Sequence, residues 1–386
     1  MSFSFRSLTD MGDVRGKRVL LRLDLNVPLK DGVVFDDFRI RKSLPTIEWL
    51  RERGARIICI SHCEGKGEGG APTTLRPVAE YLKQTLPVSF VETYVDDATH
   101  ALVDGLKDGE MLLLENLRIY AGEKENDLAF VQSLAGLADV YVNEAFSVSH
   151  REHASVVGIP QYLPSVAGFL FQSEVEHLSK AFSPAHPFTF ILGGAKFETK
   201  IPLITKFVGI ADTVCVGGAL ANNFFKEAGY ALGASMVSQG DFGLAELQRT
   251  APVVLPKDVV VENNGIRATK MPTEVSGQDV IMDAGPQTLA ELRDIIGRAQ
   301  CVLWNGPLGN FEEGFTEGTE ALAKMIAEWT TPERMSMVGG ADTLAAISKL
   351  GVTERFTFVS SGGGAMLDFL SRGTLPGIEA LTKAPR

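Results

Sequence analysis

The chain has 386 residues, 45% of them hydrophobic, and a formal net charge of −11. This length predicts two domains, because a single hydrophobic core stops growing at roughly 250–300 residues. The acidic balance argues against a nucleic-acid partner, although a local basic cluster could still bind a small anion. The sequence shows no apolar signal-peptide region, no membrane-spanning stretch and four cysteines without zinc or redox spacing, so we expect a cytoplasmic protein.

In the first half of the chain, short apolar segments with β-forming residues alternate with segments of helical periodicity. This alternation predicts βαβ units, and hence a parallel sheet that is covered by helices on both faces. We expect strands at residues 19–27, 56–61, 110–116 and 139–143, and helices at 40–53 and 74–86.

Polar and basic residues stand near the ends of these predicted strands. Because the carboxyl ends of parallel strands meet at one edge of a sheet, five basic residues would converge there and form a site for a polyanion. The five are Arg39, His62, Arg118, His150 and Arg151. Each one alone is more often an ordinary surface charge. His150 and His153 could also mimic a metal pair, but the sequence offers no third ligand.

Residues 158–187 separate the two halves. They contain four prolines around a segment, 172–182, whose apolar residues recur at helical spacing. A proline-bounded helix between two sheets is typical of a connector, and we interpret it as a hinge.

In the second half, an apolar strand runs five times into a glycine-containing turn and then into a helix-like segment. The turns lie at residues 192–196, 216–220, 305–309, 338–343 and 360–366. Glycines let the backbone approach a phosphate, and the first amides of the next helix point toward it, so five such turns favour a phosphate or nucleotide site. The alternative is that α/β folds use glycine in tight turns anyway. Neither a Walker A motif nor a dinucleotide fingerprint is present.

Lys196 and Lys200 follow the first of these turns. Their spacing predicts that both lie on one helix face near its start, where two cations oppose the helix dipole unless an anion lies between them. They would then clamp nucleotide phosphates; the alternative is a solvated charged face. Asp342 follows the fourth turn, either as the cap of a helix or as the single carboxylate that Mg²⁺ commonly uses beside nucleotide phosphates.

Eight segments carry a resemblance to a known family. They are RLDLNVP at 22–28, LENLR at 114–118, NEAF and HREHAS between 143 and 155, LGGAKFETKI at 192–201, WNGPLGNFE at 304–312, GGADT at 339–343 and SSGGGA at 360–365. Together, in this order and over nearly the whole chain, they resemble phosphoglycerate kinases. The resemblance implies an α/β fold of two Rossmann-like, doubly wound parallel-sheet domains that are joined by a hinge helix.

The same resemblance implies that the chain is divided into domains that bind different substrates. Residues 1–170 would form the N-terminal domain that binds 3-phosphoglycerate, and residues 171–186 the hinge helix between the domains. Residues 187–370 would form the C-terminal domain that binds the nucleotide. Residues 371–386 would be a tail that returns to the first domain.

Site residues follow from the resemblance by motif match. The acid would be bound by Asp24, Asn26, Arg39, His62, Arg118, His150 and Arg151. The nucleotide would be bound by Gly194, Lys196, Lys200, Gly218, Asn305, Pro307, Glu312, Gly339, Gly340, Ala341, Asp342 and Thr343, with Asp342 also holding Mg²⁺. The transferred phosphoryl group would be stabilised by Arg39, Lys196, Lys200, Gly340 and Gly363.

The implied reaction is reversible phosphoryl transfer between 1,3-bisphosphoglycerate and ADP, giving 3-phosphoglycerate and ATP. It would proceed by direct in-line displacement with Mg²⁺ and hinge closure, in an enzyme expected to be a monomer without nucleic-acid or membrane partners. Two alternatives come from other classes. A hinged binding protein would not need Lys196 and Lys200 together with Asp342. A nicotinamide dehydrogenase would need the glycine fingerprint that the chain lacks.

Two positions depart from the family pattern. The family usually has His-Leu-Gly-Arg-Pro after its second strand, whereas residues 62–66 read His-Cys-Glu-Gly-Lys, so an arginine that touches the acid is missing. We expect Lys66 to supply part of that charge from a glycine-bearing loop. Ala341 replaces the third glycine of a Gly-Gly-Gly-Asp-Thr segment, a mild change unless that position needs a positive φ.

Overall fold

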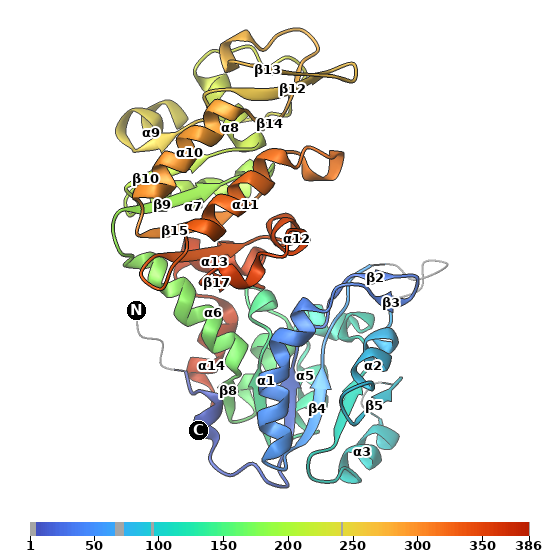
Figure 1. The fold of residues 1–386 in the computed structure, drawn as a ribbon. Coiled ribbons are helices and arrows are strands. Elements are labelled where there is room, and N and C mark those ends of the chain that lie inside the picture. Colours follow the sequence, from blue (N-terminus) through green and yellow to red (C-terminus); the bar gives the residue numbers. More distant parts are fainter. Residues whose placement is uncertain (1–4, 66–72, 94–95, 241, 386) are drawn as a thin grey trace. The chain divides into compact units, whose positions relative to one another are not determined.

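The computed structural model describes residues 5–65, 73–93, 96–240 and 242–385 (Figure 1). The chain divides into two compact units. The first consists of Met1–Glu176 together with Arg372–Arg386, and the second of His177–Ser371. Each unit is built around its own six-stranded sheet.

The sheet of the first unit is parallel throughout, as the sequence predicts. In spatial order its strands are β5 (Val88–Val91), β6 (Met111–Leu114), β4 (Arg56–Ile60), β1 (Arg18–Arg22), β7 (Val140–Asn143) and β8 (Ser165–Ala167). The central strand β1 buries Val19, Leu20 and Leu21 completely, so both of its faces are covered. Strands β5 and β8 were not predicted.

Helices α1 (Phe38–Glu52) and α2 (Arg76–Leu82) correspond to the two predicted helices of the first half. Helices α3 (Asp97–Asp104), α4 (Ala121–Glu125) and α5 (Leu128–Ala135) complete this part of the unit. Local capping explains where two of them begin. The side chain of Asp96 accepts a hydrogen bond from the Thr99 amide at the start of α3, and Asp127 does the same for Phe130 at α5.

The predicted strand at 19–27 is too long, because β1 ends at Arg22. Asp24 and Asn26 therefore lie in the loop beyond the strand. That loop leads into a two-stranded hairpin, β2 (Leu29–Lys30) and β3 (Val33–Val34), which precedes α1. The shortening places polar side chains at the carboxyl edge of the sheet rather than within it.

The sheet of the second unit is also parallel throughout. In spatial order its strands are β11 (Val253–Val254), β10 (Thr213–Val216), β9 (Phe188–Leu192), β15 (Cys301–Asn305), β16 (Met335–Gly339) and β17 (Phe358–Val359). Four of the glycine turns lead directly into α7 (Phe197–Phe207), α8 (Ala219–Glu227), α12 (Ala341–Lys349) and α13 (Gly364–Arg372). The turn after β15 leads through a short 3-10 segment, Phe311–Glu313, into α11 (Glu317–Trp329).

A three-stranded antiparallel sheet in the second unit was missed by the sequence analysis (Figure 1). Its strands are β12 (Val259–Asn263), β13 (Ile266–Lys270) and β14 (Val280–Ala284). The turn between β12 and β13 is Asn264-Gly265, and both residues have positive φ, of 50° and 81°. An Asn-Gly pair between β-forming segments is a hairpin signal that could have revealed this element.

The predicted connector helix at 172–182 is two elements in the structure. Helix α6 runs over Phe169–Ser179, and a 3-10 turn follows at Lys180–Phe182. The boundary between the two units falls inside α6, between Glu176 and His177. At the other end of the chain, α14 (Pro376–Lys383) belongs to the first unit, where the Gly377 amide donates to the Ser149 carbonyl oxygen at 2.9 Å. Within the described residues, no helix is long and apolar enough to cross a membrane.

Candidate active site

Arg39 is held beside the loop that follows β1. Its Nη1 lies 3.2 Å from Oδ2 of Asp24 and donates to the backbone oxygen of Asn26 at 2.8 Å. The same Asp24 oxygen accepts a hydrogen bond from the Ser147 hydroxyl, and Asp24 is almost fully buried. Since only Nη1 of Arg39 is engaged in these bonds and the side chain is 31% exposed, the rest of its donor fork is available to an anion.

His62 is buried just after the end of β4 (Arg56–Ile60) and stays neutral. Its Nδ1 lies 3.3 Å from Nη2 of Arg22, which is also fully buried. Burial, together with the nearby charges of Arg22, Arg118, Arg151 and Arg39, holds the pKa of His62 well below its usual range. Because a guanidinium can only donate, Nδ1 must accept, and the ring proton is therefore on Nε2. His62 is thus fixed as a neutral hydrogen-bond donor amid arginines.

The buried charge of Arg22 is balanced by a network that the sequence analysis did not identify. Nε of Arg22 donates to the Ser155 hydroxyl at 2.8 Å, and that hydroxyl donates to Oε1 of Glu123 at 2.6 Å. The amide of Ser155 donates to the other carboxylate oxygen at 2.9 Å. Burial raises the pKa of Glu123, against the lowering effect of Arg22 and Ser155. The network positions Arg22, and through it the ring of His62.

Arg118 and Arg151 share one carboxylate, that of Glu64. Oε1 of Glu64 lies 2.8 Å from Nη1 of Arg151 and 3.4 Å from Nη2 of Arg118. Burial and the neighbouring Arg151 charge lower the pKa of Arg118. His150 is half-buried and directly precedes Arg151 in the chain. The structure therefore brings basic side chains together at the carboxyl edge of the sheet. This basic cluster already pairs with the carboxylate of Glu64, a residue that the sequence did not indicate as part of the site.

In the second unit, the first three glycine turns are packed against one another. The amide of Gly193 donates to the Asn305 oxygen at 2.9 Å, and that of Gly194 donates to the Pro307 oxygen at 2.8 Å. A Cβ at Gly193 would lie 2.1 Å from the Pro307 oxygen, and one at Gly218 would lie 2.6 Å from the Gly194 nitrogen. Close backbone contact thus explains these glycines without a ligand, and it brings the three turns to one place.

Lys196 and Lys200 do not share a helix face, contrary to the sequence prediction. Lys196 is the exposed N-cap of α7 and has a non-helical backbone, whereas Lys200 lies within the helix. Lys200 is buried, and its Nζ donates back to the Gly193 oxygen. Burial lowers the pKa of Lys200 to about 8, against the raising effect of the Asp342 carboxylate and with a further lowering effect of Lys196. The two lysines and Asp342 therefore lie within each other's electrostatic range.

The turn between β16 and α12 shows which residue caps the helix and whether Ala341 has a positive φ. The N-cap of α12 is Gly340, with φ of 106°, so Asp342 is not the cap; it is exposed in the first helical turn. Ala341 is the first residue of the helix and is not among the described non-glycine residues with positive φ. Alanine therefore fits where the family usually has glycine. Gly339, which ends β16, would clash with Met366 if it carried a Cβ.

The remaining predicted residues of this region lie at the end of β15 or in the segments that follow β15, β16 and β17. Thr343 is buried, and its hydroxyl accepts the Gly306 amide at 3.0 Å, which ties α12 to the turn after β15. Asn305 is buried at the end of β15, and Glu312 is exposed in the 3-10 segment. Gly363 precedes α13 with φ of 50° and has open space around its Cβ position. In the described part of the chain, no group of three His, Cys, Asp or Glu side chains is arranged to hold a metal ion.

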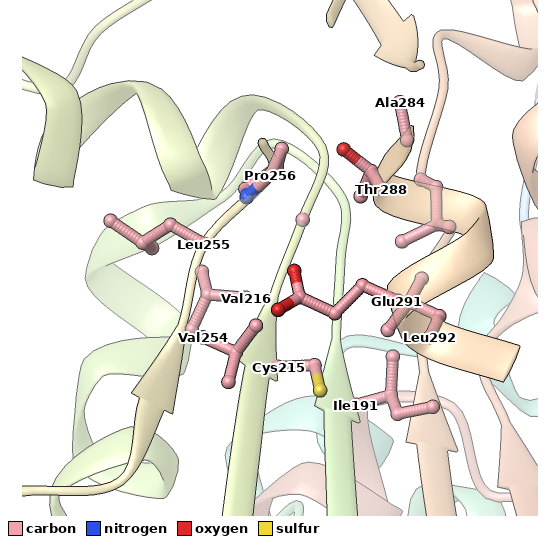
Figure 2. A pocket seen from close by; sticks show the side chains of 12 residues that line it. Ile191, Cys215, Val216, Val254, Leu255, Pro256, Ala284, Thr288, Glu291 and Leu292 are labelled. Carbon is pink, nitrogen blue, oxygen red and sulfur yellow. The ribbon is translucent and has the colours of Figure 1, made fainter. Parts of the chain in front are cut away.

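An apolar cavity of about 20 Å³ lies between β9, β10 and helix α10 (Pro286–Arg298) (Figure 2). Its lining includes Cys215, Leu255 and Thr288, with the carboxylate of Glu291 among them. This carboxylate is 3.1 Å from Nζ of Lys257, so its charge is already paired. This volume is enough for about one water molecule.

Comparisons with known proteins identify the family. A family model described as "Phosphoglycerate kinase" matches residues 8–372. A phosphoglycerate kinase from Moorella thermoacetica is 43% identical over an alignment 389 residues long, and this alignment covers 96% of this chain and 98% of that protein. The solved phosphoglycerate kinase of Coxiella burnetii is 36% identical, with a TM-score of 0.83 and 98% of both chains covered. That of Pyrococcus horikoshii OT3 is 33% identical, with a TM-score of 0.85 and coverage of 97% and 98%. The chain therefore belongs to the phosphoglycerate kinase family of phosphotransferases.

Proposed function

We propose that the chain catalyses reversible phosphoryl transfer between 1,3-bisphosphoglycerate and ADP, giving 3-phosphoglycerate and ATP. The observation that carries this proposal is the pair of cationic sites. One is the cluster of arginines around the neutral His62 in the first unit. The other is Lys200 beside Lys196 and Asp342 in the second unit. Both stand out on a chain of net charge −11, where cations gathered at strand ends favour anionic substrates.

The first unit would bind the acid. Arg118, Arg151 and the free donors of Arg39 match the carboxylate and phosphate groups of 3-phosphoglycerate, because a guanidinium fork pairs with both. The Nε2–H of His62 adds a neutral donor. Asp24 and Asn26 hold Arg39 in place through the bonds described above. In this proposal the Arg22–Ser155–Glu123 network has no contact with the acid and acts by positioning.

The second unit would bind the nucleotide. Lys200 and Lys196 would contact phosphate oxygens, helped by the amides that open α12 and α13 after Gly340 and Gly363. Asp342 is suited to hold Mg²⁺, since its carboxylate is exposed and does not cap the helix. One carboxylate is sufficient when substrate phosphates supply other ligands. When bound, Mg²⁺ would neutralise part of the phosphate charge.

The proposed mechanism is direct in-line transfer without a phosphorylated enzyme. Phosphoryl transfer asks for positioning and charge stabilisation rather than covalent chemistry from the protein. Arg39 would bind the equatorial oxygens as negative charge spreads over them, and Lys200 would act from the nucleotide side. Because the two sets of residues belong to different units, the proposal includes closure about residues 158–187, which would also exclude water.

The proposal is tested by measuring ATP formation from ADP and 1,3-bisphosphoglycerate with the full chain. We expect turnover that depends on Mg²⁺ and is strongly reduced in Lys200→Ala. Binding of either substrate without turnover would instead support a hinged binding protein. Oxidation or reduction of a nicotinamide cofactor would support a dehydrogenase.

A further inference from the structure

Glu64 is fixed at the basic cluster by both its backbone and its side chain. Its amide donates to Oδ1 of Asn26 at 3.0 Å, which anchors the residue beside the loop after β1. Its carboxylate bridges Arg151, at 2.8 Å, and Arg118, at 3.4 Å, through the same oxygen. A single carboxylate oxygen thus sits where two guanidinium groups converge.

The carboxylate of Glu64 is charged, and its side chain is exposed enough to move away from Arg118 and Arg151. Its hydrogen bond from Arg151 is the main cause that holds the pKa of this carboxyl below its usual range, so Glu64 is ionised near neutral pH. The side chain of Glu64 is 51% exposed, whereas those of Arg118 and Arg151 are only 13% and 31% exposed. The arginines are therefore held against the protein, while the glutamate approaches them from the solvent side.

We propose that Glu64 is an internal competitor of the acid substrate: its carboxylate occupies the place between Arg118 and Arg151 that a substrate anion takes, and it must swing out before the acid binds. This rests on the proposed function, which assigns both arginines to the acid. A second anion beside a bound Glu64 would meet its like charge, and it would find Nη1 of Arg151 and Nη2 of Arg118 already occupied by the Glu64 carboxylate. The residue thereby sets the affinity of the site.

Removing the competitor should strengthen acid binding without touching the reacting groups. Glu64→Gln keeps the size of the side chain but weakens its hold on the arginines. We expect KM for 3-phosphoglycerate to fall by about three- to tenfold, which corresponds to releasing two partly exposed ion pairs. We expect kcat to stay the same, because the free enzyme is relieved of competition while the bound complex is unchanged.

Two other roles for Glu64 predict different results. If Glu64 positions the arginines for the substrate, Glu64→Gln should raise KM. If it only repels the substrate through its charge, Glu64→Asp should leave KM unchanged, because the charge remains. Under direct competition Glu64→Asp should lower KM, since the side chain is shorter by about 1.5 Å and no longer reaches both arginines.

Glu152→Gln is the matched control. Glu152 directly follows Arg151, is exposed, and takes no part in the ion pairs formed by Arg118 or Arg151 in the described part of the chain. The substitution changes the net charge by the same amount as Glu64→Gln. We expect it to leave KM within about twofold of the wild-type value.

The test combines steady-state kinetics for 3-phosphoglycerate with calorimetric binding of inorganic phosphate to the full chain without nucleotide. Competition predicts lower KM and tighter phosphate binding in Glu64→Gln and in Glu64→Asp, and neither in Glu152→Gln. Unchanged or weaker binding in both Glu64 variants would overturn the inference. If the wild-type chain showed no turnover, the proposed function would fail, while phosphate binding would still decide whether Glu64 competes for the arginines.

Discussion

Replacing Lys200 by methionine should stabilise the second unit near pH 7, even though it removes a charge that the proposed reaction needs. Lys200 is 8% exposed, and its pKa falls from an ordinary 10.5 to about 8, chiefly because of burial. The unfolded chain therefore binds a proton at Lys200 more tightly than the folded chain does. Below pH 8 Lys200 is protonated in both states, and its buried charge lowers the free energy of unfolding by the full amount that the pKa difference represents. This loss of stability is recovered as the pH rises from 8 toward 10.5.

The size of the effect follows from the pKa. A fall from 10.5 to about 8 corresponds to about 3 kcal/mol of destabilisation by the protonated form. Methionine removes this charge but also removes the hydrogen bond to the Gly193 oxygen, at a cost of about 1 kcal/mol. We therefore expect Lys200→Met to be more stable than the wild type by about 2 kcal/mol at pH 7.

Urea unfolding at pH 7 and at pH 10, followed by the fluorescence of Trp304 and Trp329 in the second unit, measures this difference. The advantage of Lys200→Met should be largest at pH 7 and should shrink at pH 10, while turnover is lost at both. Lys196→Met is the control, since Lys196 is exposed and should change stability by less than about 0.5 kcal/mol. A Lys200→Met variant that is less stable at pH 7, or whose advantage does not depend on pH, would show that the buried charge of Lys200 does not destabilise the folded chain.

Three further predictions concern the acid site and the motion. Arg39→Ala should lower kcat by about 10² or more with a smaller change in KM, because Arg39 acts mainly on the transition state; near wild-type kcat would exclude it from the mechanism. Lys66 lies outside the described residues, so its role stays a prediction: Lys66→Ala should raise KM for 3-phosphoglycerate a few-fold at low ionic strength, and an unaltered KM there would reject it. X-ray scattering should show a smaller radius of gyration with both substrates than with neither, and an unchanged radius would count against closure about residues 158–187.

Much of the fold could be predicted from the sequence because its signals are local. Apolar strands that end in glycine turns mark the five turns that follow β9, β10, β15, β16 and β17, and alternation with helices identifies both six-stranded sheets as parallel. The antiparallel sheet of β12, β13 and β14 was missed although Asn264-Gly265 signals its hairpin. Strand ends were less accurate, since the apolar pattern at 19–27 continues through Leu23 and Leu25 after β1 has ended.

The site was harder to predict, because the spacing of residues in the sequence does not determine where their side chains point. The i, i+4 spacing of Lys196 and Lys200 implied a shared face, but α7 starts one residue after Lys196 and Lys200 turns back to the Gly193 oxygen. Glu64 was noticed only as the neighbour of a missing arginine. Its pairing with Arg118 and Arg151 joins residues 54 and 87 positions apart, which only the folded chain brings together.

In the proposed function this chain passes a phosphoryl group between the acid and the nucleotide, and ³¹P nuclear magnetic resonance can follow that transfer. With 3-phosphoglycerate, Mg²⁺ and ATP at equilibrium, magnetisation should exchange between the γ-phosphate of ATP and the acyl phosphate of 1,3-bisphosphoglycerate, without release of inorganic phosphate. Lys200→Ala should abolish this exchange, because the nucleotide end loses its buried cation. Absence of exchange in the wild-type chain, or release of inorganic phosphate in its place, would show that the chain does not transfer the phosphoryl group between these substrates.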